Sequence, residues 1–523
     1  MSINKVIKSV AVIGGGPAGI ACVNELVHVS QNGRSLLETC VKPVTTAFDK
    51  VVCFEQNSKL GGVWNFFKEP DAQLPPLHAL NRGTYNKPDG IYERPSIPNR
   101  KSLQSATREH PFVRLSEKTL SEEHRWHRNA AYKDLFTNVP EKYMRFSYTP
   151  MENLSRGRYL EPLVSMDDIT DYLERVIDRY DLRRHFRVNS GVERIEKVVK
   201  ENGQEKWLLT IREKTPSTKV EQWYTEEFDA VVAANGHCNV PFIPKTEGLN
   251  EFVRKYPNVV KHSKSYRDAN DYRNSKILLC GSGTSSADLL QYLSPVAKGV
   301  TVSQRSESVY PWIVDCFKMV SNVQFKPRIS KYLHETGEVM FEDGTVGKYD
   351  HVILSTGYHY HFPFLNPEDE LVKIYDHHEN NSPVSKIGNL YLYTFSTIDN
   401  SFATAGIPTF GLMFHGMEYS AAAIAGVFSG SKRLPDLKDQ IQWDEYRTKR
   451  KEPEVPHRFQ GFFLDKAEEQ LLNPLFSLAP EGRTNPLQRD RWRSSEVDAS
   501  TPALIKAFRS LVSGKCKPAE LLK

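Results

Sequence analysis

The sequence predicts an α/β protein built from two doubly wound, Rossmann-like dinucleotide-binding domains. Two segments, residues 9–26 (SVAVIGGGPAGIACVNEL) and 276–293 (KILLCGSGTSSADLLQYL), each combine a buried strand, a glycine-rich turn and the start of a helix. Two more, residues 228–244 and 349–364, are each a strand followed by small residues, a glycine and an aromatic-rich loop. Strands that alternate with helices in this way are typical of parallel sheets covered by helices.

The first glycine-rich turn has the pattern Gly-x-Gly-x-x-Gly, with a strand before it and a helix after it. Glycines at these places permit a tight turn and let a pyrophosphate approach the backbone amides at the start of the helix. In this context a purely structural turn is the weaker interpretation. The expected cofactor-binding residues here are Gly14, Gly16, Pro17, Ala18 and Gly19.

The next strand ends in Glu55, where a carboxylate can bind the hydroxyl groups of a ribose. Glu55 follows Gly14 by 41 residues (55 − 14), about twice the usual ~20, and an insertion at residues 30–48 accounts for the difference. The motif LGGVW then places two glycines, which allow close backbone approach, before a flat tryptophan. Alone, this motif indicates a turn with a core tryptophan. After a dinucleotide-binding strand it fits a flavin neighbour better, which makes candidates of Gly62, Val63 and Trp64.

In the second glycine-rich turn, a serine replaces the third glycine, which usually allows close packing of the helix on the strand. We therefore expect this turn to be looser than the first. Its candidate cofactor-binding residues are Gly281, Gly283, Thr284, Ser285 and Ser286. Asp288, in the first turn of the helix, could cap backbone amides or fix loop side chains.

The strand that follows the second turn ends near Arg305, at the place where the first unit has Glu55. An acid there favours a free ribose hydroxyl, whereas an arginine accommodates a 2′-phosphate. The first unit therefore predicts FAD and the second predicts NADPH. The alternative for Arg305 is an ordinary solvated surface arginine.

Composition and charge argue against several other classes of protein. The 523 residues, 39% hydrophobic and 25% charged, are typical of a globular protein with two or more domains. A net charge of +5 from 69 basic and 64 acidic residues, without a dense basic run, argues against nucleic-acid binding. The seven cysteines never occur as C-x-x-C, which argues against a zinc ribbon, a disulfide framework and a dithiol redox site.

We expect neither a metal site nor a membrane anchor. No acid or cysteine at ligand spacing accompanies His359, His361, His377 and His378. The apolar run before the first glycines is too short for a secretory signal. The longest uncharged segment, residues 400–417, contains a proline, three glycines and a histidine, so it fits a buried lining rather than a membrane span. A cytoplasmic location is the expectation.

The segment LFTNVPEKYM contains Asn138-x-x-Glu141 with Pro140 between them. This is a capping-box pattern with proline in the first turn. The residues alone therefore predict that Asn138 caps a short helix.

Seven motifs in order give the chain a family resemblance. The succession GGGPAG, EQNSKLGGVW, LFTNVPEKYMRF, AANGHCNVPFIP, KHSKSYRD, GSGTSSAD and STGYHYHFPF resembles the flavin-containing monooxygenases, class B flavoproteins that use FAD, NADPH and O2. It extends from about residue 8 to residue 435 and indicates a soluble, fungal-type member with insertions. The family fingerprint FxGxxxHSxxY is half present: Tyr256 and Asn258 depart from it, whereas His262, Ser263 and Tyr266 match.

The resemblance implies a reaction and a role for Asn138. In the family, NADPH reduces FAD, the reduced flavin forms a hydroperoxide with O2, and a soft nucleophile, an amine nitrogen or a sulfur, takes one oxygen. Asn138 matches the family's asparagine that touches the flavin where oxygen reacts, and Thr137 and Val139 flank it. The resemblance therefore favours a flavin contact for Asn138 over helix capping, and Thr137 would then cap the helix. The expected partners are a small nucleophilic substrate and O2, and a homodimer is a candidate assembly.

Two alternatives stay open. One is another class B reaction, either Baeyer–Villiger oxygenation of a ketone or N-hydroxylation of an amino acid. Baeyer–Villiger enzymes usually present an arginine where this chain has Asn138, and no amino-acid recognition motif is found. The other alternative is a binding protein that holds FAD and NADPH without turnover. Intact glycines, Glu55, Trp64 and Asn138 count against it.

The expected domain order is that of the disulfide reductases, with the NADPH domain inserted into the FAD domain. The FAD domain would occupy residues 1–245 and 346–523, including a C-terminal extension, and the NADPH domain residues 246–345. A second insertion, residues 66–130, is rich in Pro, Arg, Asn and His with little periodicity. Loops this long are usually functional or mobile, so it either decorates the surface or covers the active site.

Overall fold

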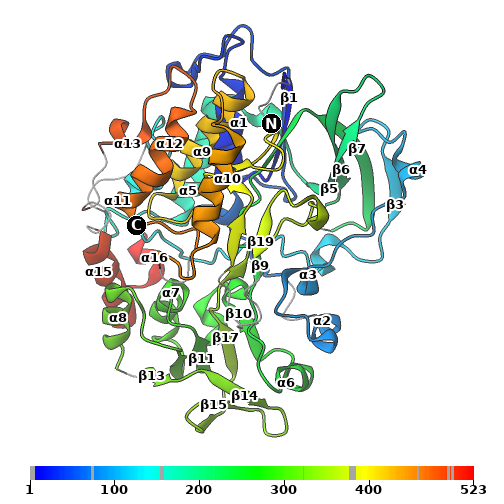
Figure 1. Cartoon of the computed structure of the whole chain (residues 1–523). Helices are drawn as coiled ribbons and strands as arrows, with labels where there is room; N and C mark the ends of the chain where they lie inside the picture. Colours follow the sequence, from blue (N-terminus) through cyan, green and yellow to red (C-terminus); the bar gives the residue numbers. More distant parts are fainter. Residues whose placement is uncertain are drawn as a thin grey trace.

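The computed structural model places the strands and helices of the chain in two lobes (Figure 1). It describes residues 6–71, 76–152, 158–215, 217–321, 323–375, 385–455, 459–491, 495 and 500–522. Among these residues, no helix has the length and apolar character needed to cross a membrane.

The first lobe is built on a seven-stranded sheet. Its strand order is β21 (Leu390–Tyr391), β22 (Phe395–Ser396), β23 (Phe402–Thr404), β8 (Ala230–Ala233), β1 (Ser9–Ile13), β2 (Lys50–Phe54) and β4 (Phe186–Arg187). The five strands from β23 to β4 are parallel. Helices α1 (Pro17–Val27) and α9 (Met413–Phe428) pack against each other beside this sheet, in the upper part of Figure 1. Both are buried along almost their whole length, which suits their many alanines and glycines.

The second lobe contains a five-stranded parallel sheet. Its order is β10 (Val260–His262), β17 (His351–Leu354), β11 (Lys276–Cys280), β12 (Gly299–Ser303) and β13 (Val323–Lys326). Helices α7 (Thr284–Leu293) and α8 (Pro311–Lys318) contribute to its core, and α6 (Leu249–Lys255) contacts a small antiparallel sheet of β14 (Ile329–Leu333), β15 (Glu338–Phe341) and β16 (Val346–Gly347).

Strand β17 corrects one expected boundary. From the sequence, we expected this strand to belong to the second part of the FAD domain, which was to begin at residue 346. Instead, β17 pairs with β10 and β11 in the second sheet. A short buried run of Val and Ile can complete either parallel sheet, and the choice depends on long-range partners that the sequence pattern does not reveal. The two lobes then connect through β9 (Val240–Pro241) and β18 (Tyr358–His359), which pair antiparallel.

The described residues of the 66–130 insertion, 66–71 and 76–130, include regular elements of the fold. They contain α2 (Leu77–Arg82), α3 (Pro88–Ile91), α4 (Arg100–Leu103) and β3 (Phe112–Leu115). Strand β3 adds an edge to an antiparallel sheet whose other strands are β7 (Val220–Phe228), β6 (Glu205–Glu213) and β5 (Ser190–Val199), at the right of Figure 1. A further hairpin pairs β19 (Lys373–Tyr375) with β20 (Lys386–Gly388).

Helix α5 (Met166–Arg179) shows how the sequence specifies a local element. Ser165 and Asp168 form a capping box at its start, which satisfies backbone amides that have no partner inside the helix. Its buried residues recur at helical spacing: Ile169, Tyr172, Leu173, Val176 and Ile177. The residues just before this helix pair with the chain next to Asn138, through an antiparallel bridge between Ser165 and Phe136.

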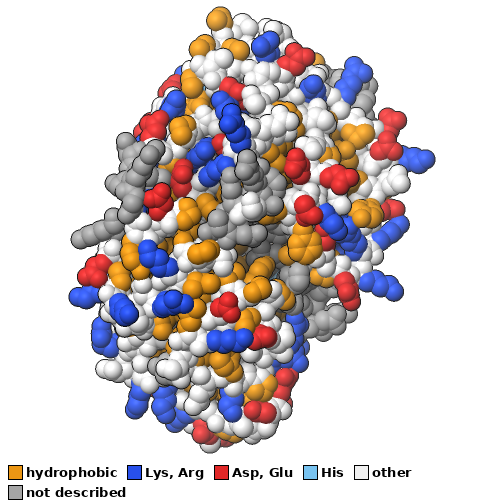
Figure 2. Space-filling view, turned by 90° about the vertical axis from the view of Figure 1, so that its left-hand side faces the viewer, with side chains coloured by type: hydrophobic (Ala, Val, Ile, Leu, Met, Phe, Trp, Pro, Cys, Tyr) orange, Lys and Arg blue, Asp and Glu red, His pale blue; other side chains and the backbone are white. Residues whose placement is uncertain are grey.

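The C-terminal region returns to both lobes. It contains α10 (Leu437–Thr448), α11 (Leu464–Ala467), a π-helical segment (Glu468–Leu472), α12 (Asn473–Ser477), α13 (Pro486–Arg489), α15 (Ser500–Val512) and α16 (Pro518–Leu521). Helix α12 packs on α9 of the first lobe, whereas α15 packs on α7 and α8 of the second. Figure 2 views the side of the molecule that carries α8 and α15, and apolar side chains are visible across the middle of this face among scattered charges of both signs.

Candidate active site

A cavity of about 1920 Å³ extends from the first glycine turn to the second. Most of the candidate residues line it: Gly14, Gly16, Pro17, Ala18, Glu55, Gly62, Val63, Trp64, Asn138, Val139, Gly281, Gly283, Thr284, Ser285 and Arg305. Thr137 and Asp288 line a smaller chamber that adjoins it, and Gly19 and Ser286 lie beneath the turns. One continuous space therefore contacts both predicted dinucleotide sites.

The first turn has room only for glycine at its tightest points. Gly14 has φ +108°, and a Cβ there would lie 2.5 Å from the carbonyl oxygen of Ala234. A Cβ on Gly19 would lie 1.9 Å from the carbonyl oxygen of Gly14. No side chain caps helix α1, whose N-cap is Gly16. The start of the helix is thus left to an anionic ligand, as the glycine pattern predicts for a pyrophosphate.

The side chain of Glu55 is fixed by backbone amides at the edge of the cavity. Its Oε2 accepts from the amide of Gly15 at 2.7 Å and its Oε1 from the amide of Asn57 at 2.8 Å. Burial raises the pKa of Glu55, and the two amides oppose this by stabilising the anion. The carboxylate therefore has a set orientation, with lone pairs left to accept from a diol.

The GGVW motif packs directly on the first turn. The amide of Gly61 donates to the carbonyl of Gly15 at 2.9 Å, and a Cβ on Gly62 would lie 2.9 Å from the Cα of Gly16. The carbonyl of Trp64 accepts from the hydroxyl of Thr170 on α5 at 2.8 Å. Trp64 is only partly buried and lines the cavity.

The capping hypothesis for Asn138 is wrong. The helix that follows is one 3₁₀ turn, Glu141–Tyr143, with Pro140 at its N-cap position and no side-chain cap. Thr137 does not cap it either: its hydroxyl donates to the carbonyl of Val139 at 2.9 Å and accepts from the amide of Val164.

The backbone pairing that shapes this loop leaves the carboxamide of Asn138 at the cavity. The amide of Thr137 donates to the carbonyl of Val164 at 2.8 Å, and that of Met166 donates to the carbonyl of Leu135 at 2.9 Å. Asn138 is exposed at the bend, lines both the cavity and the adjoining chamber, and its side chain has no hydrogen-bond partner within the described part of the chain. It is available to a ligand.

The second turn also has a position that admits only glycine. Gly281 has φ +126°, and a Cβ there would lie 2.6 Å from the carbonyl oxygen of Ser355. Ser286 occupies the position that corresponds to Gly19 in the first turn, and it is fully buried. Its Oγ has no hydrogen-bond partner among the described residues. Gly283 is the N-cap of α7, again without a side-chain cap.

Asp288 fixes side chains and caps no amide. Its carboxylate accepts from the hydroxyl of Tyr132, and from Nε2 of Gln291 at 2.7 Å. Burial raises the pKa of Asp288 to about 6, and the two donors act in the opposite direction. Of the two roles expected for Asp288, the structure supports the fixing of a loop side chain.

Arg305 follows β12 and is exposed at the rim of the cavity. Ser303, at the end of β12, and Arg328, which precedes β14, also line the cavity. Arginine is well suited to hold a phosphate through two parallel hydrogen bonds.

Sequence reasoning missed the residues that the 66–130 insertion brings to the cavity: Tyr92, Arg125, His127 and Asn129. Asn129 donates to the carbonyl of Gly62 at 2.7 Å, and Arg125 pairs with Glu193 on β5 at 2.7 Å. The insertion therefore forms part of the cavity wall. No periodicity could have identified these residues, because they lie on an irregular segment.

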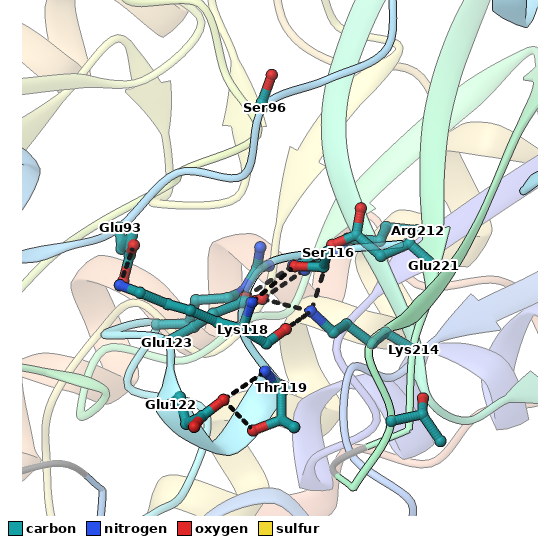
Figure 3. Close-up of polar contacts among 12 residues, drawn as sticks. Glu93, Ser96, Ser116, Lys118, Thr119, Glu122, Glu123, Arg212, Lys214 and Glu221 are labelled. Atoms are coloured by element: carbon teal, nitrogen blue, oxygen red, sulfur yellow. Dashed lines mark hydrogen bonds and ion pairs between the residues drawn. The ribbon is translucent and has the colours of Figure 1, made fainter. Parts of the chain in front are cut away.

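A buried ion-pair network holds that segment in place. Figure 3 shows Glu123 between Arg212 on β6 and Lys214, with Glu221 of β7 beside them. The carboxylate of Glu123 accepts from Arg212 Nη1 at 2.9 Å and from Lys214 Nζ at 2.7 Å. Because a buried charge left without its partner costs several kcal/mol, the network fixes residue 123, and with it the cavity-lining residues that follow.

Among the described residues, no group of three or more His, Cys, Asp or Glu side chains could hold a metal ion. His359 and His361 are buried beside the cavity, and His361 pairs with Asp89 at 3.1 Å. His377 and His378 lie outside the described residues.

Comparisons with known proteins agree with this geometry. The model of the FMO-like family, flavin-binding monooxygenase-like proteins, matches residues 118–320 and 314–463, more than half of the chain. The chain is 28% identical over 451 residues to a flavin-containing monooxygenase, FMO GS-OX-like 9, of Arabidopsis thaliana, covering 86% of this chain and 82% of the relative. It is 27% identical over 361 residues to the trimethylamine monooxygenase of Methylocella silvestris, covering 68% and 61%. The solved structure of S-allyl-L-cysteine S-oxygenase from Allium sativum shares the fold, with a TM-score of 0.63 at 23% identity over 95% of this chain and 98% of that one.

Proposed function

The chain belongs to the flavin-binding monooxygenase-like family of FAD- and NADPH-dependent oxidoreductases, and we propose that it transfers one oxygen atom of O2 to a soft nucleophile, an amine nitrogen or a sulfur. For a sulfide the balance is R2S + O2 + NADPH + H⁺ → R2SO + NADP⁺ + H2O. The observation that carries the proposal is the single cavity that joins both glycine turns, with the carboxamide of Asn138 on its wall and without a hydrogen-bond partner among the described residues.

The residues around the first turn fit FAD. The turn excludes side chains at Gly14 and Gly19, the start of α1 is uncapped, and Glu55 offers an oriented carboxylate. Such a site suits a pyrophosphate next to a ribose. Gly62 and Trp64, packed on the turn, would border the flavin half of the cofactor.

The residues around the second turn fit NADPH. An uncapped helix start follows Gly283, and Arg305 stands at the rim for a 2′-phosphate. When bound, FAD reduced by NADPH supplies the activation of O2, because cofactors carry chemistry that side chains lack.

The protein's own tasks would be to position the reactants and to exclude water. The carboxamide of Asn138 can donate and accept hydrogen bonds, and would orient the reacting oxygen toward the nucleophile. No acid–base residue is required, since a sulfide or a neutral amine attacks without losing a proton. The names of two relatives, trimethylamine monooxygenase and S-allyl-L-cysteine S-oxygenase, support heteroatom oxygenation over Baeyer–Villiger chemistry.

The test is a coupling measurement on Asn138→Ser, with NADPH consumed and product formed measured on the same samples. The wild type should form nearly one sulfoxide or N-oxide per NADPH with some member of a panel of sulfides and tertiary amines. Asn138→Ser should keep FAD and its reduction by NADPH, while product falls well below NADPH consumed and hydrogen peroxide makes up the difference.

The matched control is Asn202→Ser, the same change in an exposed turn outside the cavity, which should leave coupling intact. Full coupling in Asn138→Ser would remove Asn138 from the reaction. A wild type that forms esters from ketones would overturn the proposed function in favour of Baeyer–Villiger chemistry. A wild type whose flavin absorbance is not bleached by NADPH would overturn it in favour of a binding protein.

A further inference from the structure

A second, smaller chamber of about 200 Å³ adjoins the main cavity. The two spaces share lining residues, among them Trp64, Asn138 and Leu504. The chamber therefore begins where the main cavity meets the carboxamide of Asn138, the group proposed to orient the reacting oxygen.

The walls of the chamber are largely apolar. Phe136, Ala287 and Phe508 are buried there as members of the core of the second lobe, and Leu504 and Trp312 pack against the same core. Burying an apolar group against such walls is favourable by about 25 cal/mol per Å² of surface removed from water.

The polar groups of the chamber mostly have partners within the protein. The hydroxyl of Thr137 bonds to the backbone of Val139 and Val164, and the carboxylate of Asp288 accepts from Tyr132 and Gln291. Asp288 is the charged residue among the described lining residues, so a ligand with a carboxylate of its own would be repelled. The chamber suits a neutral apolar group.

Helix α15, in the C-terminal region, forms one wall of this chamber. It contributes Leu504 and Phe508, and it packs on α7 and α8. The match to the family model ends at residue 463, so this wall comes from a segment outside the matched region. The hydroxyl of Ser500, at the start of α15, lies 3.5 Å from the carbonyl oxygen of Asn138, which joins the helix to the loop at the reacting centre.

The size of the chamber limits its occupant. An engineered protein cavity of about 150 Å³ lined by Leu, Ile and Phe binds benzene. A space of about 200 Å³ thus accepts a group of about the size of a phenyl ring.

We propose that this chamber is the subsite for an apolar substituent of the nucleophile, and that Leu504 and Phe508 of α15 set the largest substituent that the enzyme accepts. The inference rests on the proposed function and narrows its substrate class to neutral sulfides or tertiary amines that carry a ring-sized apolar group.

The experiment compares a methyl, a phenyl and a naphthyl substrate in filled and enlarged chambers. The substrates are dimethyl sulfide, methyl phenyl sulfide and methyl naphthyl sulfide, or the corresponding N,N-dimethyl amines if the wild type oxygenates nitrogen. Leu504→Trp fills the chamber and Leu504→Ala enlarges it. Ile505→Ala, a half-buried neighbour on α15 that lines neither space, is the control.

The readout is the ratio of kcat/KM for the phenyl substrate to that for the methyl substrate, because a general loss of folded enzyme lowers both values equally. Leu504→Trp should lower this ratio about tenfold or more, since apolar pockets discriminate roughly 10- to 200-fold per methylene. Leu504→Ala should raise the relative rate for methyl naphthyl sulfide, and Ile505→Ala should leave the ratio unchanged.

The subsite would be overturned if Leu504→Trp left the phenyl-to-methyl ratio unchanged and Leu504→Ala left the relative rate for methyl naphthyl sulfide unchanged. If Leu504→Trp does not fold, Leu504→Ala decides alone. A wild type that oxygenates none of the substrates would overturn the proposed function itself, a result visible before any variant is made.

Discussion

Replacing Gly19 with alanine should weaken FAD binding without touching the cofactor. Gly19 does not line the cavity, and its hydrogen atom faces the carbonyl oxygen of Gly14. The added Cβ would lie 1.9 Å from that oxygen, whereas ordinary contacts begin at 3.4 Å, so the first turn and helix α1 must separate by about 1.5 Å.

The magnitude follows from overpacking. Extra methyl groups forced into well-packed sites typically cost about 1–3 kcal/mol. If the displaced turn must return to its position to hold the pyrophosphate, the same free energy opposes binding, and the Kd for FAD should rise roughly 5- to 150-fold.

The assay is titration of apoprotein with FAD, followed by quenching of flavin fluorescence, together with chemical unfolding of the apoprotein. Gly299→Ala is the control, because a Cβ at Gly299 meets no heavy atom within 4 Å. It should bind FAD as the wild type does. A Gly19→Ala protein with wild-type affinity for FAD would refute the assignment of this turn to the cofactor.

Three further outcomes are expected. Arg305→Ala should weaken NADPH binding about tenfold or more and leave NADH nearly unchanged, because a charge-assisted bond to the 2′-phosphate contributes roughly 1.5–3 kcal/mol; equal losses for both cofactors would make Arg305 structural. At a pH above the raised pKa of Glu25, about 7, Arg483→Met should lower the free energy of unfolding by about 3–5 kcal/mol, since it leaves the buried carboxylates of Glu25 and Glu418 without their cation, and unchanged denaturation midpoints would contradict this. Burial raises the pKa of Glu25 to about 7, so the folded protein holds a proton on Glu25 that the unfolded chain releases near pH 4.5, and the free energy of unfolding should fall as pH rises between these values. Glu25→Gln should become more stable relative to the wild type over the same pH window, and parallel plots of unfolding free energy against pH for the two proteins would exclude this contribution of Glu25.

The sequence alone predicted the features that depend on local backbone geometry. Both glycine turns lie between a strand and a helix as expected, and Ser286 takes the place of the third glycine in the second turn. These features depend on residues that are close along the chain, because glycine gives the backbone more freedom and proline restricts it. The position of Glu55 was likewise predicted, because it depends only on the end of a strand.

Long-range pairing explains what the sequence did not reveal. The capping-box pattern at Asn138 is local, but pairing of Thr137 with Val164 and the position of Pro140 prevent it from forming. The insertion appeared irregular because distant partners order it, as when Glu123 binds Arg212, 89 residues away. Its contribution to the cavity wall is therefore a property of tertiary structure.

The most direct test of the central claim is the fate of molecular oxygen. The holoenzyme is supplied with NADPH, 18O2 and a sulfide or tertiary amine, and the product is analysed by mass spectrometry. Our account predicts one 18O atom in each product molecule and close to one product per NADPH oxidised, because the oxygen passes from O2 to the nucleophile inside the cavity. Product that carries oxygen from water, or hydrogen peroxide as the sole reduced form of O2 with every nucleophile, would contradict it.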